Sequence, residues 1–407
     1  MSFEKPINYL NDNFDRFLND LKDCLRIPSI STLSDHQSDI DVCAQFISDE
    51  MSQIGLQNIQ SFTEYGNPII YSDYIVDPSR PTILFYGHYD VQPVDPLELW
   101  ESSPFDPQIR EGYIFARGAS DNKGMFFSQL KAVESYLKSS SLPVNVKFVI
   151  EGEEEIGSDC MTPFLNDHKD LLSCDSVVVS DNPMFSSDQP SICVSLRGLI
   201  YLEVFVEAMN YDVHSGQLGG SVPNIIHYIS QLVSSMKDPK SNRILIPGFY
   251  DDVIEFATFD YQSDVVKKQL NDLDNYYRLG NHANDQFFKN SWFLPTLDCN
   301  GILSGFTGEG AKTVIPNSLM LKLSCRLVPN QNPKKMIELV SNYIKENLPD
   351  TFNISINDFN TQAMPLQTDI HSPFVQAAKE ALRITHQRDV LIQGEGGSIP
   401  ILRGFQD

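Results

Sequence analysis

The chain has 407 residues, more than one hydrophobic core usually serves, so we expect two domains. Lys and Arg total 30 against 54 Asp and Glu, and the net charge of -24 argues against partners such as nucleic acid or a membrane surface. The sequence has no apolar run of membrane-spanning length, and its seven cysteines include no Cys-x-x-Cys pair. These features predict a cytoplasmic protein with reduced thiols.

The first part of the chain alternates helical and extended patterns. A helical stripe is predicted by the apolar residues Val42, Phe46, Ile47, Met51 and Ile54. Apolar runs at 82–86, 146–150 and 176–179 predict strands, and the segment 125–137 predicts a helix between two of them. Strands that alternate with helices indicate an α/β fold with a largely parallel central sheet and helices on both faces. Such sheets place their chemistry beyond the carboxyl ends of the strands.

The pattern changes after about residue 197. Strictly alternating apolar residues predict two strands with one covered face, at Ile200, Leu202, Val204 and Val206 and at Leu319, Leu321, Leu323, Cys325 and Leu327. Apolar stripes predict two helices, at 222–236 and 336–344. We interpret this region as a small α+β domain, one sheet covered by two helices, with a polar insertion at 237–300. A further helix is predicted at 372–384, before the Gly-rich "QGEGGSIPI".

The stretch "ILFYGHYDVQP" (83–93) begins as a buried strand and then contains His88 and Asp90. Because side chains alternate across a strand, both residues project from the same face, where the carboxylate can accept a hydrogen bond from one imidazole nitrogen. The other nitrogen is then oriented for a divalent metal. An isolated His-x-Asp is more often a histidine satisfied locally at a strand end, so the rest of the chain has to decide.

Three further acidic clusters lie at turns or strand ends. Asp121 follows a turn in "ARGASDNKG", four glutamates follow a strand in "FVIEGEEEIGS", and Asp181 ends a strand in "SVVVSDN". Each has a local explanation: a helix N-cap for Asp121, a solvated acidic loop for the glutamates, and a turn for Asp181. Together, however, they would bring His88, Asp121, a glutamate and Asp181 to one edge of one sheet.

So many carboxylates at one edge would repel each other and take up protons unless cations held them apart. A histidine with carboxylates is a ligand set suited to Zn²⁺ or a similar divalent ion, and a shared aspartate could bridge two ions. Two such ions would activate a water near neutral pH and polarise a carbonyl group. The sequence therefore predicts metal-assisted hydrolysis of an amide.

The motifs "GHYDVQP", "RGASDNKG", "EGEEEIGS", "SDN" and "HSGQLGG", in this order and spacing, resemble the M20 family of metallopeptidases. The resemblance is to its carnosinase and cytosolic nonspecific dipeptidase branch, and it runs from about residue 10 to the end. It implies a catalytic domain made of residues 1–196 and 366–407, with a lid and dimerisation domain at 197–365. It also implies a dipeptide substrate, a homodimer formed through the lid, and two divalent ions per subunit, Zn²⁺ or Mn²⁺.

The resemblance also implies roles for the residues of the catalytic domain. His88 and Asp181 would bind one metal, Asp121 would bridge the two, and Glu155 would bind the second. Asp90 would orient His88, in agreement with the strand geometry. Glu154 would be the general base that takes a proton from water and gives it to the leaving amine. Spacing alone does not assign the glutamates in "EEE"; the family pattern does, and it leaves Glu153 facing solvent.

In the lid, His214 of "YDVHSGQLGG" matches a histidine that reaches the partner subunit's active site and stabilises the oxyanion. Without the motif, it would be a loop histidine before a Gly-rich turn. Arg326 lies on the strand face opposite Leu321 and Leu323, and resembles a residue that binds the substrate's C-terminal carboxylate. Thr313 and Ser398 match positions that help to bind this carboxylate and the peptide backbone, although both residue types are common in turns for local reasons.

One departure from the family pattern concerns its last metal ligand, a histidine beyond "GGSIP". The sequence ends at Asp407 without a histidine in that place. We therefore expect an impaired second metal site, and a catalytic domain truncated at its C-terminal end.

Four other functions are weighed against a dipeptidase. A deacylase of N-acylated amino acids would use the same motifs, and a non-catalytic homologue would keep the fold and only bind peptides. A glycosidase with two glutamates would not need the histidine beside Asp121 and Asp181. A serine hydrolase is disfavoured because the sequence contains no Gly-x-Ser-x-Gly elbow.

Overall fold

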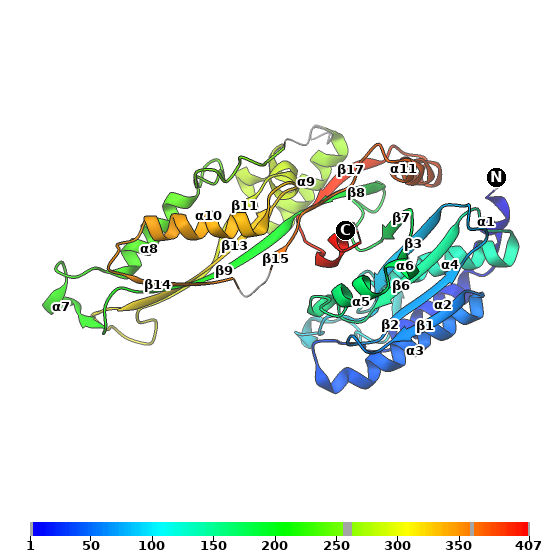
Figure 1. Ribbon diagram of the computed structural model, residues 1–407, viewed down its shortest axis with the longest axis horizontal. Coiled ribbons are helices and arrows are strands. Elements are labelled where there is room, and N and C mark those ends of the chain that lie inside the picture. Colours follow the sequence, from blue (N-terminus) through cyan, green and yellow to red (C-terminus); the bar gives the residue numbers. More distant parts are fainter. Residues whose placement is uncertain (1–2, 255–262, 359–361, 406–407) are drawn as a thin grey trace. The chain divides into compact units, whose positions relative to one another are not determined.

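The computed structural model describes residues 3–254, 263–358 and 362–405, and the chain forms two compact units (Figure 1). Unit 1 comprises Met1–Asn182 and Gly404–Asp407, and unit 2 comprises Pro183–Arg403. This division follows packing and does not test which residues form a catalytic domain. The expected boundaries at 196 and 365 therefore stay a prediction.

A mixed sheet forms the centre of unit 1. Among the described residues it has five strands in the order β1-β2-β6-β3-β7. β3 runs parallel to both β6 and β7, as the alternation of strands with helices predicted, whereas β2 is antiparallel to β1 and β6. The three predicted strands are confirmed, and the antiparallel edge is a feature that the sequence analysis missed. The strand bounds are β1 (Gln57–Phe62), β2 (Ile69–Tyr74), β3 (Thr82–His88), β6 (Asn145–Glu151) and β7 (Ser176–Val179).

Helices cover both faces of this sheet (Figure 1). Phe148 on β6 packs with residues of α3 and α4 in one hydrophobic core. The next residue toward the N-terminus, Lys147, points to the opposite face, where its Nζ donates to the carbonyls of Leu171 and Ser173 at the end of α6. The helices of unit 1 are α1 (Glu4–Asp12), α2 (Phe14–Leu25), α3 (Gln37–Ile54), α4 (Lys123–Ser139), α5 (Met161–Asp167) and α6 (Lys169–Leu172); a short hairpin adds β4 (Gln108–Arg110) and β5 (Tyr113–Phe115).

The helix predicted around residues 42–54 is confirmed as α3, but one member of its stripe is wrong. Val42 is exposed, whereas Ile40, Cys43 and Ala44 are buried. The buried stripe of an α-helix advances by three or four residues, so Cys43, Ile47, Met51 and Ile54 share a face that excludes Val42.

Unit 2 contains a long antiparallel sheet with helices on one face. The order is β11-β13-β9-β14, and β15 also pairs with β9. The alternating apolar residues of β9 and β13 are buried against α8 and α10, as predicted from the sequence, whereas Phe205 on the other face of β9 is exposed. The bounds are β9 (Gly198–Glu207), β11 (Thr296–Leu303), β13 (Ser318–Leu327), β14 (Asn353–Asn357), β15 (Gln362–Ala363), α8 (Ile225–Met236) and α10 (Pro333–Glu346).

Asparagine caps set the first residues of both covering helices. Asn224 accepts a hydrogen bond from the amide of Ile226, so α8 begins after the predicted position 222. Asn332 accepts one from the amide of Lys335, and Pro333 occupies the first turn of α10, where its missing N–H leaves no donor unpaired.

The segment 237–300, predicted to be a polar insertion, contributes a strand to the sheet. Its end forms the first part of β11, whose side chains are largely exposed, so the sequence carries no alternating apolar signal there. The segment also contains α9 (Asp264–Tyr277) and a π-helical turn at Lys289–Phe293. Residues 255–262 of this insertion lie outside the described residues.

The rest of unit 2 forms a three-stranded sheet in the order β16-β8-β17. The helix predicted at 372–384 is confirmed as α11 (Pro373–His386). The strands are β8 (Ser191–Leu196), β16 (Leu366–Gln367) and β17 (Leu391–Glu395). Among the described residues, no helix is both long enough and apolar enough to cross a membrane.

We expect Leu321→Ala to lower the free energy of unfolding of unit 2 by about 2–5 kcal/mol, because the side chain is fully buried under α8 and α10 and its removal leaves a cavity. Phe205→Ala, on the uncovered face, is the control and should cost less than about 1 kcal/mol. Calorimetric unfolding of the full chain measures both. Equal losses would contradict this assignment of the two faces.

Candidate metal centre

The carboxyl ends of the parallel strands bring the predicted site residues of unit 1 together. β3 ends at His88, and β7 ends two residues before Asp181. Asp121 lies in the turn before α4, whose N-cap position is taken by Asn122 without a side-chain capping bond. The local explanation of Asp121 as a helix cap therefore does not apply.

His88 is fully buried, and its two ring nitrogens face different groups. Nδ1 lies 3.1 Å from the carbonyl oxygen of Asp90 and 3.2 Å from its Oδ1. Nε2 lies 3.1 Å from Oδ1 of Asp121, 3.6 Å from Oδ1 of Asp181 and 3.9 Å from Oε2 of Glu154. With the proton on Nδ1, the lone pair of Nε2 points into a group of carboxylates.

His88, Asp121 and Asp181 form a group with the spacing of metal ligands. One donor atom from each residue lies within 4.8 Å of the other two. One imidazole nitrogen with carboxylate oxygens suits Zn²⁺ and similar divalent ions, so the residues present fit such an ion.

The buried carboxylate of Asp90 connects His88 to the glutamate loop. Besides facing Nδ1 of His88, it accepts hydrogen bonds from the backbone amides of Glu154 and Glu155, at 3.2 and 3.1 Å. The hydroxyl of Ser31 donates to it at 2.6 Å. Asp90 therefore lies where the prediction needs it, and it also fixes the backbone of both glutamates. The second connection and Ser31 were not foreseen, because local spacing carries no signal for contacts between such distant segments.

The three glutamates of "EEE" have different surroundings. Glu154 faces Nε2 of His88, whereas the Oε2 atom of Glu155 accepts a hydrogen bond from Nε2 of Gln92 at 2.7 Å. Glu155 is not part of the three-residue ligand group. The expectation that Glu153 faces solvent is wrong: the residue is half-buried, and its carboxylate accepts the backbone N–H of Asn67 at 2.8 Å, which compensates for its partial burial.

The acidic surroundings shift the pKa values of several groups. Burial raises the pKa of Glu154 to about 7, and the nearby charges of Asp181 and Glu155 act in the same direction. The hydrogen bond with His88 lowers the pKa of Asp121. Although burial opposes it, hydrogen bonds to Asp121, Asp181 and Asp90 hold the pKa of His88 well above its usual value. The site thus attracts positive charge.

Asn122 is a buried residue that connects the ligands and that the sequence analysis did not single out. Its Nδ2 donates to Oδ1 of Asp181 at 2.8 Å and to the carbonyl of Ser180, and its Oδ1 accepts the backbone N–H of His88 at 3.3 Å. It also directly follows Asp121. One amide side chain therefore ties the ends of β3 and β7 to the turn that carries Asp121.

The predicted substrate-binding residues His214, Thr313, Arg326 and Ser398 form two groups in unit 2. His214 and Thr313 lie on the paired strands β10 (Val213–His214) and β12 (Val314–Ile315) or directly beside them, with 3.0 Å between His214 Nε2 and Thr313 Oγ1. Nδ1 of His214 accepts the amide of Gly216, so Nε2 carries the proton of the neutral ring. In the other group, Nη1 of Arg326 donates to Oγ of Ser398 at 3.1 Å.

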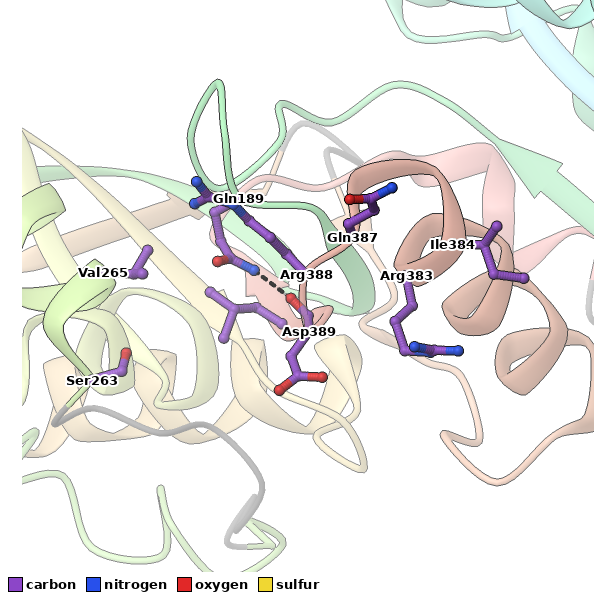
Figure 2. A pocket seen from close by; sticks show the side chains of 9 residues that line it. Gln189, Ser263, Val265, Arg383, Ile384, Gln387, Arg388 and Asp389 are labelled. Carbon is purple, nitrogen blue, oxygen red and sulfur yellow. Dashed lines mark hydrogen bonds between the residues drawn. The ribbon is translucent and has the colours of Figure 1, made fainter. Parts of the chain in front are cut away.

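A pocket of about 830 Å³ lies elsewhere in unit 2 (Figure 2). Its lining includes Gln189, Arg383, Arg388 and Asp389, and Nε2 of Gln189 donates to the carbonyl of Asp389 at 2.6 Å. None of the predicted site residues lines it. Both arginines are paired with acids, Arg383 with Glu380 and Arg388 with Asp188, so their charges are already compensated.

Comparison with known proteins agrees with this geometry. The model of peptidase family M20/M25/M40 matches residues 84–401. The chain belongs to this family. It is 32% identical over 355 residues to a human Beta-Ala-His dipeptidase, covering 84% of this chain and 69% of that protein.

Two further relatives span nearly the whole chain. A Schizosaccharomyces pombe Cys-Gly metallodipeptidase is 29% identical over 432 residues, covering 100% of this chain and 89% of the relative. The crystal structure of human carnosine dipeptidase 1 matches 100% of this chain and 90% of its own, with a TM-score of 0.78 and 28% identity. The α/β fold expected from the sequence is thereby confirmed, and the chain is an M20 metallopeptidase.

We expect Asn122→Ala to weaken binding of a divalent ion about 10- to 100-fold, because Asp181 and the end of β3 lose the amide that orients them. Calorimetric titration with Zn²⁺ measures the affinity. Gln45→Ala, which removes an exposed hydrogen bond to Asp49 on α3, is the control and should leave the affinity unchanged. Unchanged affinity in the Asn122 variant would contradict a positioning role.

Proposed function

We propose that this M20 enzyme hydrolyses dipeptides with the help of divalent ions. The observation that carries the proposal is the convergence of His88, Asp121 and Asp181 with the carboxylate of Glu154 around one point. Relatives named as a Beta-Ala-His dipeptidase and a Cys-Gly metallodipeptidase support dipeptides as the substrate class.

In this proposal each side chain has a separate task. His88, Asp121 and Asp181 would hold an ion, which when bound lowers the pKa of a water and polarises the scissile carbonyl. Asp90 keeps the proton of His88 on Nδ1, so that Nε2 stays available. Glu154, whose pKa lies at about 7, takes a proton from the attacking water and returns it to the leaving amine.

A second ion is also part of the proposal, with Asp121 and Glu155 as its ligands. In the described part of the chain, no second group of three candidate ligands comes together. We therefore propose that this second site is occupied more weakly than the first. Zn²⁺ is the ion that the His and Asp ligands favour, and Mn²⁺ is the alternative.

The groups in unit 2 would bind the rest of the substrate. Arg326 would hold its C-terminal carboxylate, Thr313 and Ser398 would help to bind this carboxylate and the peptide backbone, and His214 would stabilise the oxyanion. In line with the resemblance, we propose that the chain forms a homodimer through the lid domain, residues 197–365. All seven cysteines are free thiols, which supports a cytoplasmic location.

We expect Glu154→Gln to reduce kcat for a dipeptide by a factor of about 10²–10⁴ without loss of bound metal, because the amide keeps the shape of the side chain but cannot accept the proton. Steady-state kinetics and metal analysis measure the two effects. Glu153→Gln is the matched control: its amide oxygen can still accept the N–H of Asn67, so activity should be retained. A fully active Glu154→Gln variant would exclude this residue as the base.

Substrate class is tested by comparing alanyl-glycine with N-acetylalanine, each in the presence of Zn²⁺ or Mn²⁺. We expect cleavage of the dipeptide only, its loss after treatment with a chelator, and recovery when the ion is added back. Preferential cleavage of the acetylated amino acid would favour a deacylase. No cleavage of either compound by protein that contains metal would favour a peptide-binding homologue.

A further inference from the structure

Arg197 is a buried arginine at the junction of β8 and β9 that has no role so far. It is only 8% exposed. Its guanidinium donates from Nε to the carbonyl of Gly396 at 3.1 Å, and from Nη1 to the carbonyls of Asn290 and Leu294, each at 3.4 Å. All of these partners are neutral, so the hydrogen bonds do not compensate the charge.

A second guanidinium, that of Arg326, lies close to the first. The hydroxyl of Ser398 connects the two residues, because it accepts from Nη1 of Arg326 and donates to the backbone carbonyl of Arg197. Burial lowers the pKa of Arg197 to about 10, and the charge of Arg326 adds to this shift. Burial also lowers the pKa of Arg326. Both cations are therefore held at an energetic cost.

The acids nearest to this pair are engaged with other groups. Oδ1 of Asp298 lies 3.0 Å from Nζ of Lys237, and Oε1 of Glu395 accepts the backbone amides of Gly396 and Gly397. Among the residues that the structure describes, no carboxylate forms an ion pair with either Arg197 or Arg326. This distinguishes the pair from Arg383 and Arg388 at the pocket in Figure 2. Asp298 and Glu395 still raise the pKa of both arginines from a distance. Two partly desolvated cations without a direct ion pair in the described part of the chain favour the binding of an anionic ligand.

The loop that carries Ser398 is built against Arg197. A Cβ atom at Gly396 would lie 2.8 Å from Nη2 of Arg197 and 2.9 Å from the carbonyl oxygen of Ser291, so only glycine allows this close approach. The guanidinium holds the loop through the carbonyl of Gly396, and the backbone of Arg197 holds it through Ser398. The position of Ser398 beside Arg326 therefore depends on Arg197.

We propose that Arg197 is a positioning residue of a carboxylate-binding site in unit 2. It fixes the loop from Gly396 to Ser398 so that Ser398 and Arg326 face the ligand, and its charge adds to the attraction for a carboxylate. That this carboxylate is the C-terminus of a dipeptide rests on the function proposed above. Arg197 acts through Ser398 and Arg326 and through its charge, without touching the ligand.

Calorimetric titration of the full chain with Zn²⁺ present tests the proposal. The probes are an alanyl-glycine analogue whose peptide bond is reduced to CH₂–NH, with a free C-terminal carboxylate, and its C-terminal amide. We expect the unsubstituted protein to prefer the carboxylate about tenfold or more, and Arg197→Met to lose most of that preference while its affinity for the amide changes less than about twofold.

Two further variants control for folding and for surface charge. Arg197→Lys keeps the charge but loses the planar guanidinium that donates to the carbonyls, so we expect an intermediate loss of preference for the carboxylate. If Arg197→Met does not fold, Arg197→Lys replaces it as the test. Arg383→Met removes an exposed arginine paired with Glu380 and should behave like the unsubstituted protein.

Equal weakening of both probes in the Arg197 variants would show a merely structural residue and would overturn the proposal. An unsubstituted protein without preference for the carboxylate would overturn it as well. Failure of the proposed function has a different signature: the carboxylate probe binds with the expected dependence on Arg197, yet alanyl-glycine is not cleaved.

Discussion

The central constraint on unit 1 is the electrostatic repulsion between acidic side chains that lie around one ring nitrogen. Asp121, Asp181 and Glu154 all lie within 3.9 Å of Nε2 of His88. Such an arrangement costs free energy unless a cation or protons neutralise it. The carboxyl ends of β3, β6 and β7 share one edge of the sheet and bring His88, Glu154 and Asp181 together there, and the turn before α4 adds Asp121. The fold thus favours the binding of positive charge at the point where the candidate metal ligands converge.

Two buried polar side chains hold these ligands in place. Asp90 fixes the ring of His88 and the backbone of the glutamate loop, and Asn122 fixes Asp181 and the end of β3. Each connects segments that are far apart in the sequence. The ligand geometry is therefore a property of the surrounding hydrogen bonds as much as of the ligands themselves, as expected for metal sites in proteins.

Much of this arrangement can be predicted from the sequence, and the exceptions have physical reasons. Continuous apolar runs identified β3, β6 and β7, which are buried or partly buried along their length, and alternating residues identified β9 and β13, which are buried on one face. β11 is largely exposed and carried no such signal. The burial of Glu153 against Asn67 and the link from Asn122 to Asp181 depend on contacts between distant segments, which local patterns do not report. The motifs gave the ligand identities, but not the network that orients them.

Unit 2 also holds like charges close together, but here the charges are positive. Arg197 and Arg326 are held near each other without an acid among the described residues to pair with, and the loop that carries Ser398 depends on the buried guanidinium of Arg197. A concentration of negative charge in unit 1 attracts a cation, and a concentration of positive charge in unit 2 attracts an anion.

The most direct test of the central claim is diffraction at the zinc absorption edge from crystals soaked in Zn²⁺. The account predicts an anomalous peak about 2.0–2.2 Å from Nε2 of His88 and from one carboxylate oxygen each of Asp121 and Asp181. If the three side chains hold no ion at saturating Zn²⁺, or if the ion binds to other residues, the account of this site is contradicted.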